Sequence, residues 1–253
     1  MAAEIPTKPG VLLISLEYKS FFDEMYEALL AVFHSKATIQ RVKKANSAIS
    51  QLSRESRPSA VLVTDEGLTT NENSHVWEAV LQYVRGGGIC VAMGNFPAFV
   101  LPDNMKPFFA KAGLPWESGP YHRTTLVLNA EATGQDLATR LPLQYSQKAL
   151  FVKNVTPADS WYVTNVDSVI ESRVFPPDNA DTPGKTPVAF ARVGDGKLGY
   201  VGDVNAEKGS DAAILAMCGF FVKMGLRFDA TRTGSLGEDN LKRRRFDTSR
   251  ATR

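Results

Sequence analysis

The sequence has few of the residues that bind metals or form disulfides: 2 cysteines and 3 histidines among 253 residues. Cys90 and Cys218 each lie among apolar residues. We therefore expect two buried thiols in a reducing compartment and no disulfide. His34, His75 and His122 lie far apart, which gives no metal-site spacing, so neither a metal nor a cofactor is expected.

Long apolar runs are absent too. The longest, residues 11–16 and 212–222, fall well short of the roughly 20 residues that a membrane-spanning helix needs. The first ten residues lack an apolar stretch followed by a small-residue cleavage site, so no secretory signal is expected. The net charge of +2 argues against a general attraction to nucleic acid. These absences favour a cytoplasmic protein, although a basic cluster from Lys242 to Arg245 leaves nuclear import open.

The first part of the chain alternates short apolar runs with amphipathic segments. Apolar runs of this length are typical of parallel strands that are covered on both faces. The expected strands are residues 11–16, 38–42, 60–64 and 89–93, and the expected helices are residues 21–33, 46–54 and 74–84. This order predicts an α/β fold with a doubly wound, mostly parallel sheet of the flavodoxin-like kind.

The rest of the chain is less regular. A short helix is expected around residues 107–112, and strands at 124–128, 149–152, 161–164 and 169–174. Two apolar runs flank Gly194-Asp195-Gly196, which predicts an added C-terminal hairpin, and a last helix is expected over residues 210–226. We expect one domain over residues 1–228 and a flexible basic tail over residues 229–253.

Three segments carry a family likeness. The first is the helix, glycine stop and strand WEAVLQYVRGGGICVAM at residues 77–93, and the second is the strand at residues 12–18 with its helix. The third is GKLGYVGDVNAE at residues 196–207. Together they resemble class I glutamine amidotransferase-like proteins, most closely the trehalose-utilisation (ThuA-like) branch. The resemblance implies that superfamily's fold, a homodimer and a carbohydrate-related substrate.

The sequence departs from this family where amidotransferases carry their nucleophile. They place a cysteine at the sharp turn after the strand, and here that turn falls at Met93, Gly94 and Asn95. Cys90 lies about three residues too early, inside the strand. The amidotransferases also carry a His-x-Glu pair after a late strand, but no histidine follows His122. A Cys-His-Glu triad is therefore not expected.

Candidate site residues follow the predicted parallel strands at the edge where such sheets bind ligands. They are Glu17, Tyr18, Asp65, Glu66, Met93, Gly94, Asn95, Asp203, Asn205 and Glu207. Glu17, Asp65 and Asn95 are the catalytic candidates, and the others, with His122, are ligand-binding candidates. The alternative is that these side chains only cap helices and form turns, with Asn95 in a left-handed turn and His122 in a surface loop.

Three hypotheses follow. The first is a catalytically degenerate amidotransferase-like protein that binds a small polar ligand or a partner chain, as a homodimer. The second is a hydrolase-type enzyme in which Glu17 or Asp65 is the general base and Asn95 holds an oxyanion. The third is a regulatory subunit that its basic tail directs to the nucleus. The aromatic pairs Phe96/Phe99 and Phe108/Phe109 fit either a dimer interface or the core.

Overall fold

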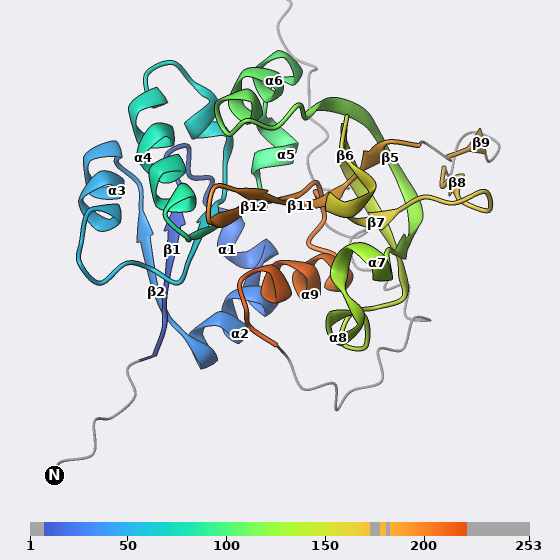
Figure 1. The fold of residues 1–253 in the computed structure, drawn as a ribbon, viewed down its shortest axis with the longest axis horizontal. Helices are drawn as coiled ribbons and strands as arrows, with labels where there is room; N and C mark the ends of the chain where they lie inside the picture. The colour runs from blue at the N-terminus through green and yellow to red at the C-terminus, as the bar shows by residue number, and fades with distance from the viewer. Residues whose placement is uncertain (1–7, 173–177, 181–182, 222–253) are drawn as a thin grey trace, which may run out of the picture. The chain divides into compact units, whose positions relative to one another are not determined.

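A ten-stranded sheet runs through the computed structural model, which describes residues 8–172, 178–180 and 183–221 (Figure 1). The strands are β1 (Gly10–Ile14), β2 (Thr38–Val42), β3 (Ala60–Val63), β4 (Ile89–Ala92), β5 (Glu117–Leu128), β6 (Gln144–Lys153), β7 (Ser160–Val163), β10 (Lys185–Thr186), β11 (Val188–Val193) and β12 (Gly196–Val201). Their order in the sheet is β10-β6-β5-β7-β11-β12-β4-β3-β1-β2. The described residues belong to one compact unit, and the predicted tail lies outside them.

The sheet is mixed, and its parallel part is the part that the sequence pattern predicts best. Strands β2, β1, β3, β4 and β12 run parallel in that order. From β12 through β11, β7, β5, β6 and β10 every pairing is antiparallel. The α/β prediction is confirmed. The segment expected to be irregular instead extends the same sheet, and β8 (Val169–Ile170) pairs separately with β9 (Asp178–Asn179).

Helices cover both faces of the sheet. One face carries α3 (Ala45–Leu52), α4 (Ser74–Arg85), α5 (Phe96–Phe99) and α6 (Pro102–Lys111), and the other carries α1 (Phe22–Met25), α2 (Glu27–Lys36), α7 (Ala130–Thr133), α8 (Gln135–Ala138) and α9 (Lys208–Met217). Successive side chains of a strand point to opposite faces, so Leu12 and Ile14 join one buried cluster and Val11 and Leu13 join the other. This two-sided burial explains why the strand sequences are apolar without alternation.

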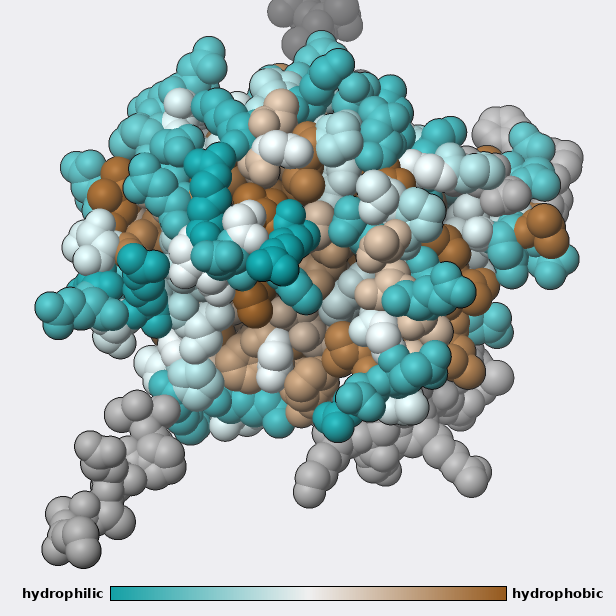
Figure 2. All heavy atoms as spheres, viewed as in Figure 1, coloured by the Kyte–Doolittle hydropathy of each residue, from teal (hydrophilic) through white to brown (hydrophobic). Residues whose placement is uncertain are grey.

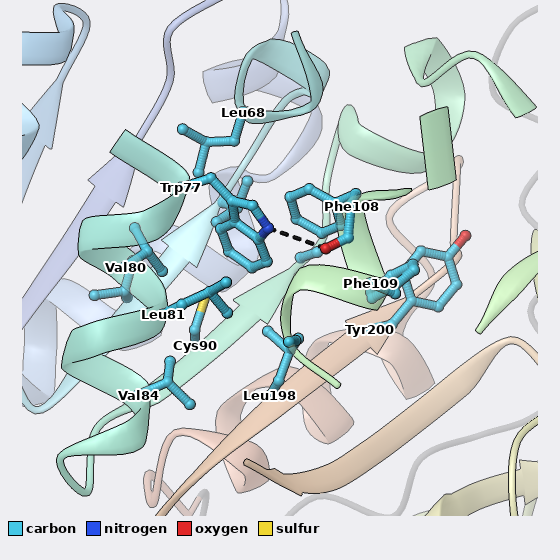
Figure 3. Close-up of a cluster of buried hydrophobic side chains, with 14 of the residues drawn as sticks. Leu68, Trp77, Val80, Leu81, Val84, Cys90, Phe108, Phe109, Leu198 and Tyr200 are labelled. Atoms are coloured by element: carbon cyan, nitrogen blue, oxygen red, sulfur yellow. Dashed lines mark hydrogen bonds between the residues drawn. The ribbon is translucent and has the colours of Figure 1, made fainter. Parts of the chain in front are cut away.

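The cluster under α4 and α6 is aromatic (Figure 3). The Trp77 indole stacks on Phe108 with ring centroids 4.0 Å apart, and its Nε1 donates to the Phe108 carbonyl oxygen at 3.0 Å. Phe96, Phe108 and Phe109 are buried in this core, whereas Phe99 is 42% exposed. The core alternative therefore holds for three of the four aromatic residues in the predicted pairs.

Two helix predictions need correction. The helix expected over residues 21–33 breaks at Tyr26 into α1 and α2, and Phe21 and Met25 are exposed although the pattern placed them on the buried face. The last helix, α9, ends at Met217 and not at residue 226. Gly219 has a φ of +77°, a conformation that favours glycine and ends the helix.

The end of β12 turns back onto β6 and closes the antiparallel part of the sheet. The Leu150 amide donates to the Gly202 carbonyl oxygen at 2.9 Å, and the Val204 amide donates to that of Lys148 at 3.1 Å. Asp203 forms a bridge with Ala149 between them. A Cβ atom on Gly202 would lie 2.0 Å from the Leu150 oxygen, so only glycine fits this crossing. No helix among the described residues is long and apolar enough to cross a membrane.

This crossing predicts a strong effect of a single methyl group. Gly202→Ala should lower the free energy of unfolding by about 3 kcal/mol, because β12 must move away from β6 to relieve the overlap. Gly10→Ala is the control, since its added Cβ would meet only Pro58 at 3.9 Å. Denaturant unfolding measures both variants, and equal stability of the two would contradict the close crossing.

Candidate functional site

The predicted polar residues do gather at one edge of the sheet, where the parallel strands β1, β3, β4 and β12 end. Residues 15–18 follow β1, residues 64–66 follow β3, residues 93–95 follow β4 and residues 202–207 follow β12. Because parallel strands share a direction, their carboxyl ends meet on the same side. His122 is the exception, since it lies within β5.

Asp65 is the buried acid of the β1–β3 loops. It is 2% exposed and begins the short 3-10 helix η1 (Glu66–Thr69), where its Oδ1 accepts from the Gly67 amide at 3.1 Å. Its Oδ2 has no hydrogen-bond partner in the described part of the chain. Burial raises the pKa of Asp65 from 3.8 to about 6, although the backbone amides of Glu17 and Gly67 lower it. Asp65 can therefore exchange a proton near neutral pH.

The other residues of these two loops have different surroundings. The Glu17 side chain is exposed, so the acid that sequence reasoning favoured faces solvent. Glu66 pairs with Lys19 at 3.4 Å, while its Oε2 lacks a partner among residues the structure describes. The Tyr18 hydroxyl donates to Asp23 at 2.9 Å, so that hydroxyl already has a partner.

The bend after β4 carries no thiol. Met93 is fully buried, Gly94 has a φ of +72°, and the Asn95 amide donates to the Thr64 carbonyl oxygen at 2.9 Å. The left-handed residue is thus Gly94, and the prediction of a left-handed Asn95, whose φ is −75°, is wrong. A Cβ on Gly94 would lie 2.7 Å from Phe22 Cε2. Asn95 is 3% exposed.

Both cysteines are core residues. Cys90 lies inside β4 with no exposed surface, and Cys218 is 5% exposed. Burial raises the pKa of the Cys90 thiol and raises that of Cys218 to about 12. Thiols of this kind are poor nucleophiles at neutral pH.

The loop after β12 forms a second group around Asp203. Its two carboxylate oxygens accept from the amides of Asn205 and Glu207, each at 2.7 Å. Glu207 forms an ion pair with Arg123 at 2.5 Å, and the Asn205 amide, oriented to match its neighbours, accepts from Arg123 Nη2 at 2.7 Å. Burial raises the pKa of Asp203, and these hydrogen bonds lower it.

The buried acids Asp65 and Asp203 have different carboxylates as electrostatic neighbours. The carboxylates that raise the pKa of Asp65 electrostatically are Glu66 and Glu17, and the one that does so for Asp203 is Glu207. We call Glu17, Asp65, Glu66 and Asn95 the Asp65 group. We call Asp203, Asn205, Glu207 and Arg123 the Asp203 group. Among the described residues, no three His, Cys, Asp or Glu side chains are placed to hold a metal ion.

His122 is not in a surface loop, so that alternative is wrong. Its ring stacks on Phe151 with centroids 4.6 Å apart, and burial and Lys185 lower its pKa. Nε2 is without a partner within residues 8–172, 178–180 and 183–221. His122 on β5 pairs with Ala149 on β6, and Ala149 forms a bridge with Asp203. One residue of β6 therefore lies between His122 and Asp203 across the sheet.

Sequence reasoning missed several residues that this edge brings together. Ser15, two residues before Glu17, and Thr64, one residue before Asp65, share a hydrogen bond of 2.7 Å. Strand-end position alone could have identified both. Arg123 and Gln147 come from β5 and β6, and only the return of β12 onto β6 brings them near Asp203. No local sequence signal predicts that contact.

Comparisons with known proteins address the fold. No family model matches the chain, and no curated protein matches it in sequence. A ThuA-like protein from Bacteroides uniformis aligns with a TM-score of 0.55 at 11% identity, covering 86% of this chain and 92% of its own. The chain has a ThuA-like fold.

Two further solved structures align less closely. A ThuA-like protein from Parabacteroides merdae has a TM-score of 0.48 at 12% identity and covers 86% of this chain and 92% of its own. A β-galactosidase from Bacillus circulans sp. alkalophilus has a TM-score of 0.49 at 11% identity over 84% of this chain. The aligned region is 31% of that enzyme. The alignment with the Bacteroides uniformis protein confirms the ThuA-like resemblance predicted from sequence at the level of fold.

Burial of both thiols predicts slow chemistry. In the native protein, neither Cys90 nor Cys218 should react with a thiol reagent within minutes, and both should react at once in denaturant. Mass spectrometry after timed labelling gives the rate at each cysteine. Rapid native modification of Cys90 would contradict its burial.

The raised pKa of Asp65 predicts a pH-dependent stability. A carboxyl whose pKa is higher in the folded state destabilises the fold once it ionises, so the cost is absent below pH 4 and complete above about pH 6. Asp65→Asn should gain up to about 3 kcal/mol over wild type across that window. Asp195→Asn, at a side chain 84% exposed, is the control. A pH-independent difference for Asp65→Asn would refute the shift.

Proposed function

We propose that this protein is a catalytically degenerate class I glutamine amidotransferase-like domain that binds a small polar ligand at the Asp65 group. The observation that carries the proposal is the bend after β4. The bend keeps the tight backbone of Gly94, but residues 93–95 contain an asparagine and no cysteine. The parallel order β2-β1-β3-β4-β12 supports the finer prediction of a flavodoxin-like arrangement.

The unpaired atoms of the Asp65 group define the ligand's chemistry. An unsatisfied buried polar group costs about 1–3 kcal/mol, so Asp65 Oδ2, which has no hydrogen-bond partner in the described part of the chain, favours a bound partner. The Asn95 side chain offers both a donor and an acceptor. The Asp65 carboxyl donates when it is protonated and only accepts when it is ionised, and it changes between these forms near pH 6. A neutral ligand with hydroxyl or amide groups satisfies both. Glu17 and Glu66 add carboxylates at its outer side.

A second candidate function is hydrolysis, and the pKa of Asp65 favours it. A general base is most effective when its pKa lies near the working pH, and about 6 is close to it. Asn95 would then donate to the developing oxyanion, and exposed Glu17 would contact the substrate. The ThuA-like fold suggests a carbohydrate-related substrate by analogy.

The oligomeric state and the cellular location are also proposals. A homodimer would cover the exposed apolar side chains Phe21, Phe99 and Leu101, of which the first two rings lie 6.3 Å apart. A cytoplasmic location, with nuclear import through Lys242–Arg245 as the alternative, rests on the sequence. The regulatory-subunit hypothesis depends on that tail.

A ligand screen by thermal shift tests the binding proposal. Neutral polyols, sugars and amides that raise the Tm of the wild type should lose that effect in Asn95→Ala and keep it in Asn71→Ala, an exposed control. Glu17→Gln should weaken the effect only partly, because that carboxylate is exposed. Ligands that stabilise wild type and Asn95→Ala equally would rule out the Asp65 group. Turnover of a hit that Asp65→Asn abolishes would favour the hydrolase.

A further inference from the structure

The Asp203 group continues inward as a buried polar cluster between β6, α1/α2 and α9. Gln147 on β6 has no exposed surface, and its Nε2 donates to the Ser210 hydroxyl at 2.9 Å. Ser210 is 1% exposed and lowers the pKa of Asp203 through its hydroxyl. Tyr145 on β6 lies under α9 so closely that a Cβ on Gly209 would be 2.4 Å from its ring. Polar side chains of three elements therefore meet at one place.

Four polar atoms in this cluster lack a hydrogen-bond partner in the described part of the chain. They are the hydroxyls of Tyr26 and Tyr145, Gln147 Oε1 and Asp211 Oδ1. Tyr26 is 2% exposed, and its hydroxyl interacts electrostatically with Asp203 and Asp211. Buried groups of this kind are nearly always paired in folded proteins. Four such atoms around one pair of aspartates can therefore accept hydrogen bonds from a bound water or ligand.

Among the described residues, the charges of the cluster are unbalanced. Asp203, Glu207 and Asp211 supply three carboxyl groups, and Arg123 supplies one guanidinium, which pairs with Glu207. Lys148 lies 5.4 Å from the Tyr121 ring centroid, and Lys208 is exposed. Burial, Asp203 and Glu207 raise the pKa of Asp211 to about 7, as expected for a carboxyl without a nearby counter-charge.

We propose that this cluster binds the ammonium group of a small primary amine, held by Asp211 Oδ1, Gln147 Oε1 and a tyrosine hydroxyl. An ammonium group has three donors and one positive charge, which match the unpaired acceptors and the excess of carboxylates. Asp211 and Tyr145 are only partly buried, so the amine's remaining atoms reach solvent there. This site uses no residue of the Asp65 group and is independent of the proposed function.

Ethylammonium chloride is the probe, compared with sodium chloride at equal ionic strength and with ethanol. At pH 8, above the pKa of Asp211, ethylammonium should raise the Tm of the full chain, and neither of the others should do so. Calorimetric titration gives the affinity. Asp211→Asn removes the charge at constant shape and should weaken binding about tenfold or more. Tyr26→Phe removes one hydroxyl and should weaken it severalfold.

The controls separate this site from the rest of the protein. Asp195→Asn removes an exposed carboxylate, and Asp65→Asn and Asn95→Ala alter the other group, so all three should bind ethylammonium like wild type. Equal Tm values in ethylammonium and sodium chloride would show that only water occupies the cluster and would overturn the proposal. Wild-type affinity in both Asp211→Asn and Tyr26→Phe would overturn it as well. If Asp211→Asn does not fold, the affinity of Tyr26→Phe for ethylammonium tests the proposal alone, and wild-type affinity in that variant overturns it.

Discussion

The bend after β4 is the constraint on which the Asp65 group depends. Gly94 is held between the Phe22 ring and the Thr64 carbonyl oxygen, where a Cβ would be 2.7 Å and 3.3 Å from them. The amides of Met93 and Asn95 donate to Val63 and Thr64 at 2.9 Å each, so the end of β3 fixes the bend. This contact places Asp65 and Asn95 on adjoining loops and turns Met93 into the core. The bend therefore carries an asparagine and no thiol.

A second constraint, the return of β12 onto β6, positions the Asp203 group. Gly202 allows the strands to cross, and Asp203 then anchors the loop by accepting from two backbone amides. The loop also contains Ala206 with a φ of +54°, which costs a non-glycine residue roughly 1–2 kcal/mol. These contacts fix the start of α9 against Tyr145 and Gln147.

Figure 2 shows one face of the molecule, where hydrophilic side chains cover much of the surface and apolar side chains lie between them.

The sequence predicts the parallel strands well because each is covered on both faces, and burial on two sides produces short apolar runs such as residues 60–63. It also places Asp65 and Asn95 shortly after such strands, at the edge where the parallel strands end. It fails where the structure depends on distant contacts. Periodicity cannot show that Tyr26 breaks its helix, or that Arg123 on β5 meets Glu207, because a crossing between β6 and β12 causes that meeting.

Glutamine hydrolysis tests the central claim that this fold works here without a thiol nucleophile. The protein is incubated with glutamine, and released glutamate is measured for wild type and for Cys90→Ala. Cys90 is fully buried in β4, and residues 93–95 contain no cysteine. Both proteins should therefore release no more glutamate than a buffer control. Glutamate release by wild type that disappears in Cys90→Ala would contradict the account.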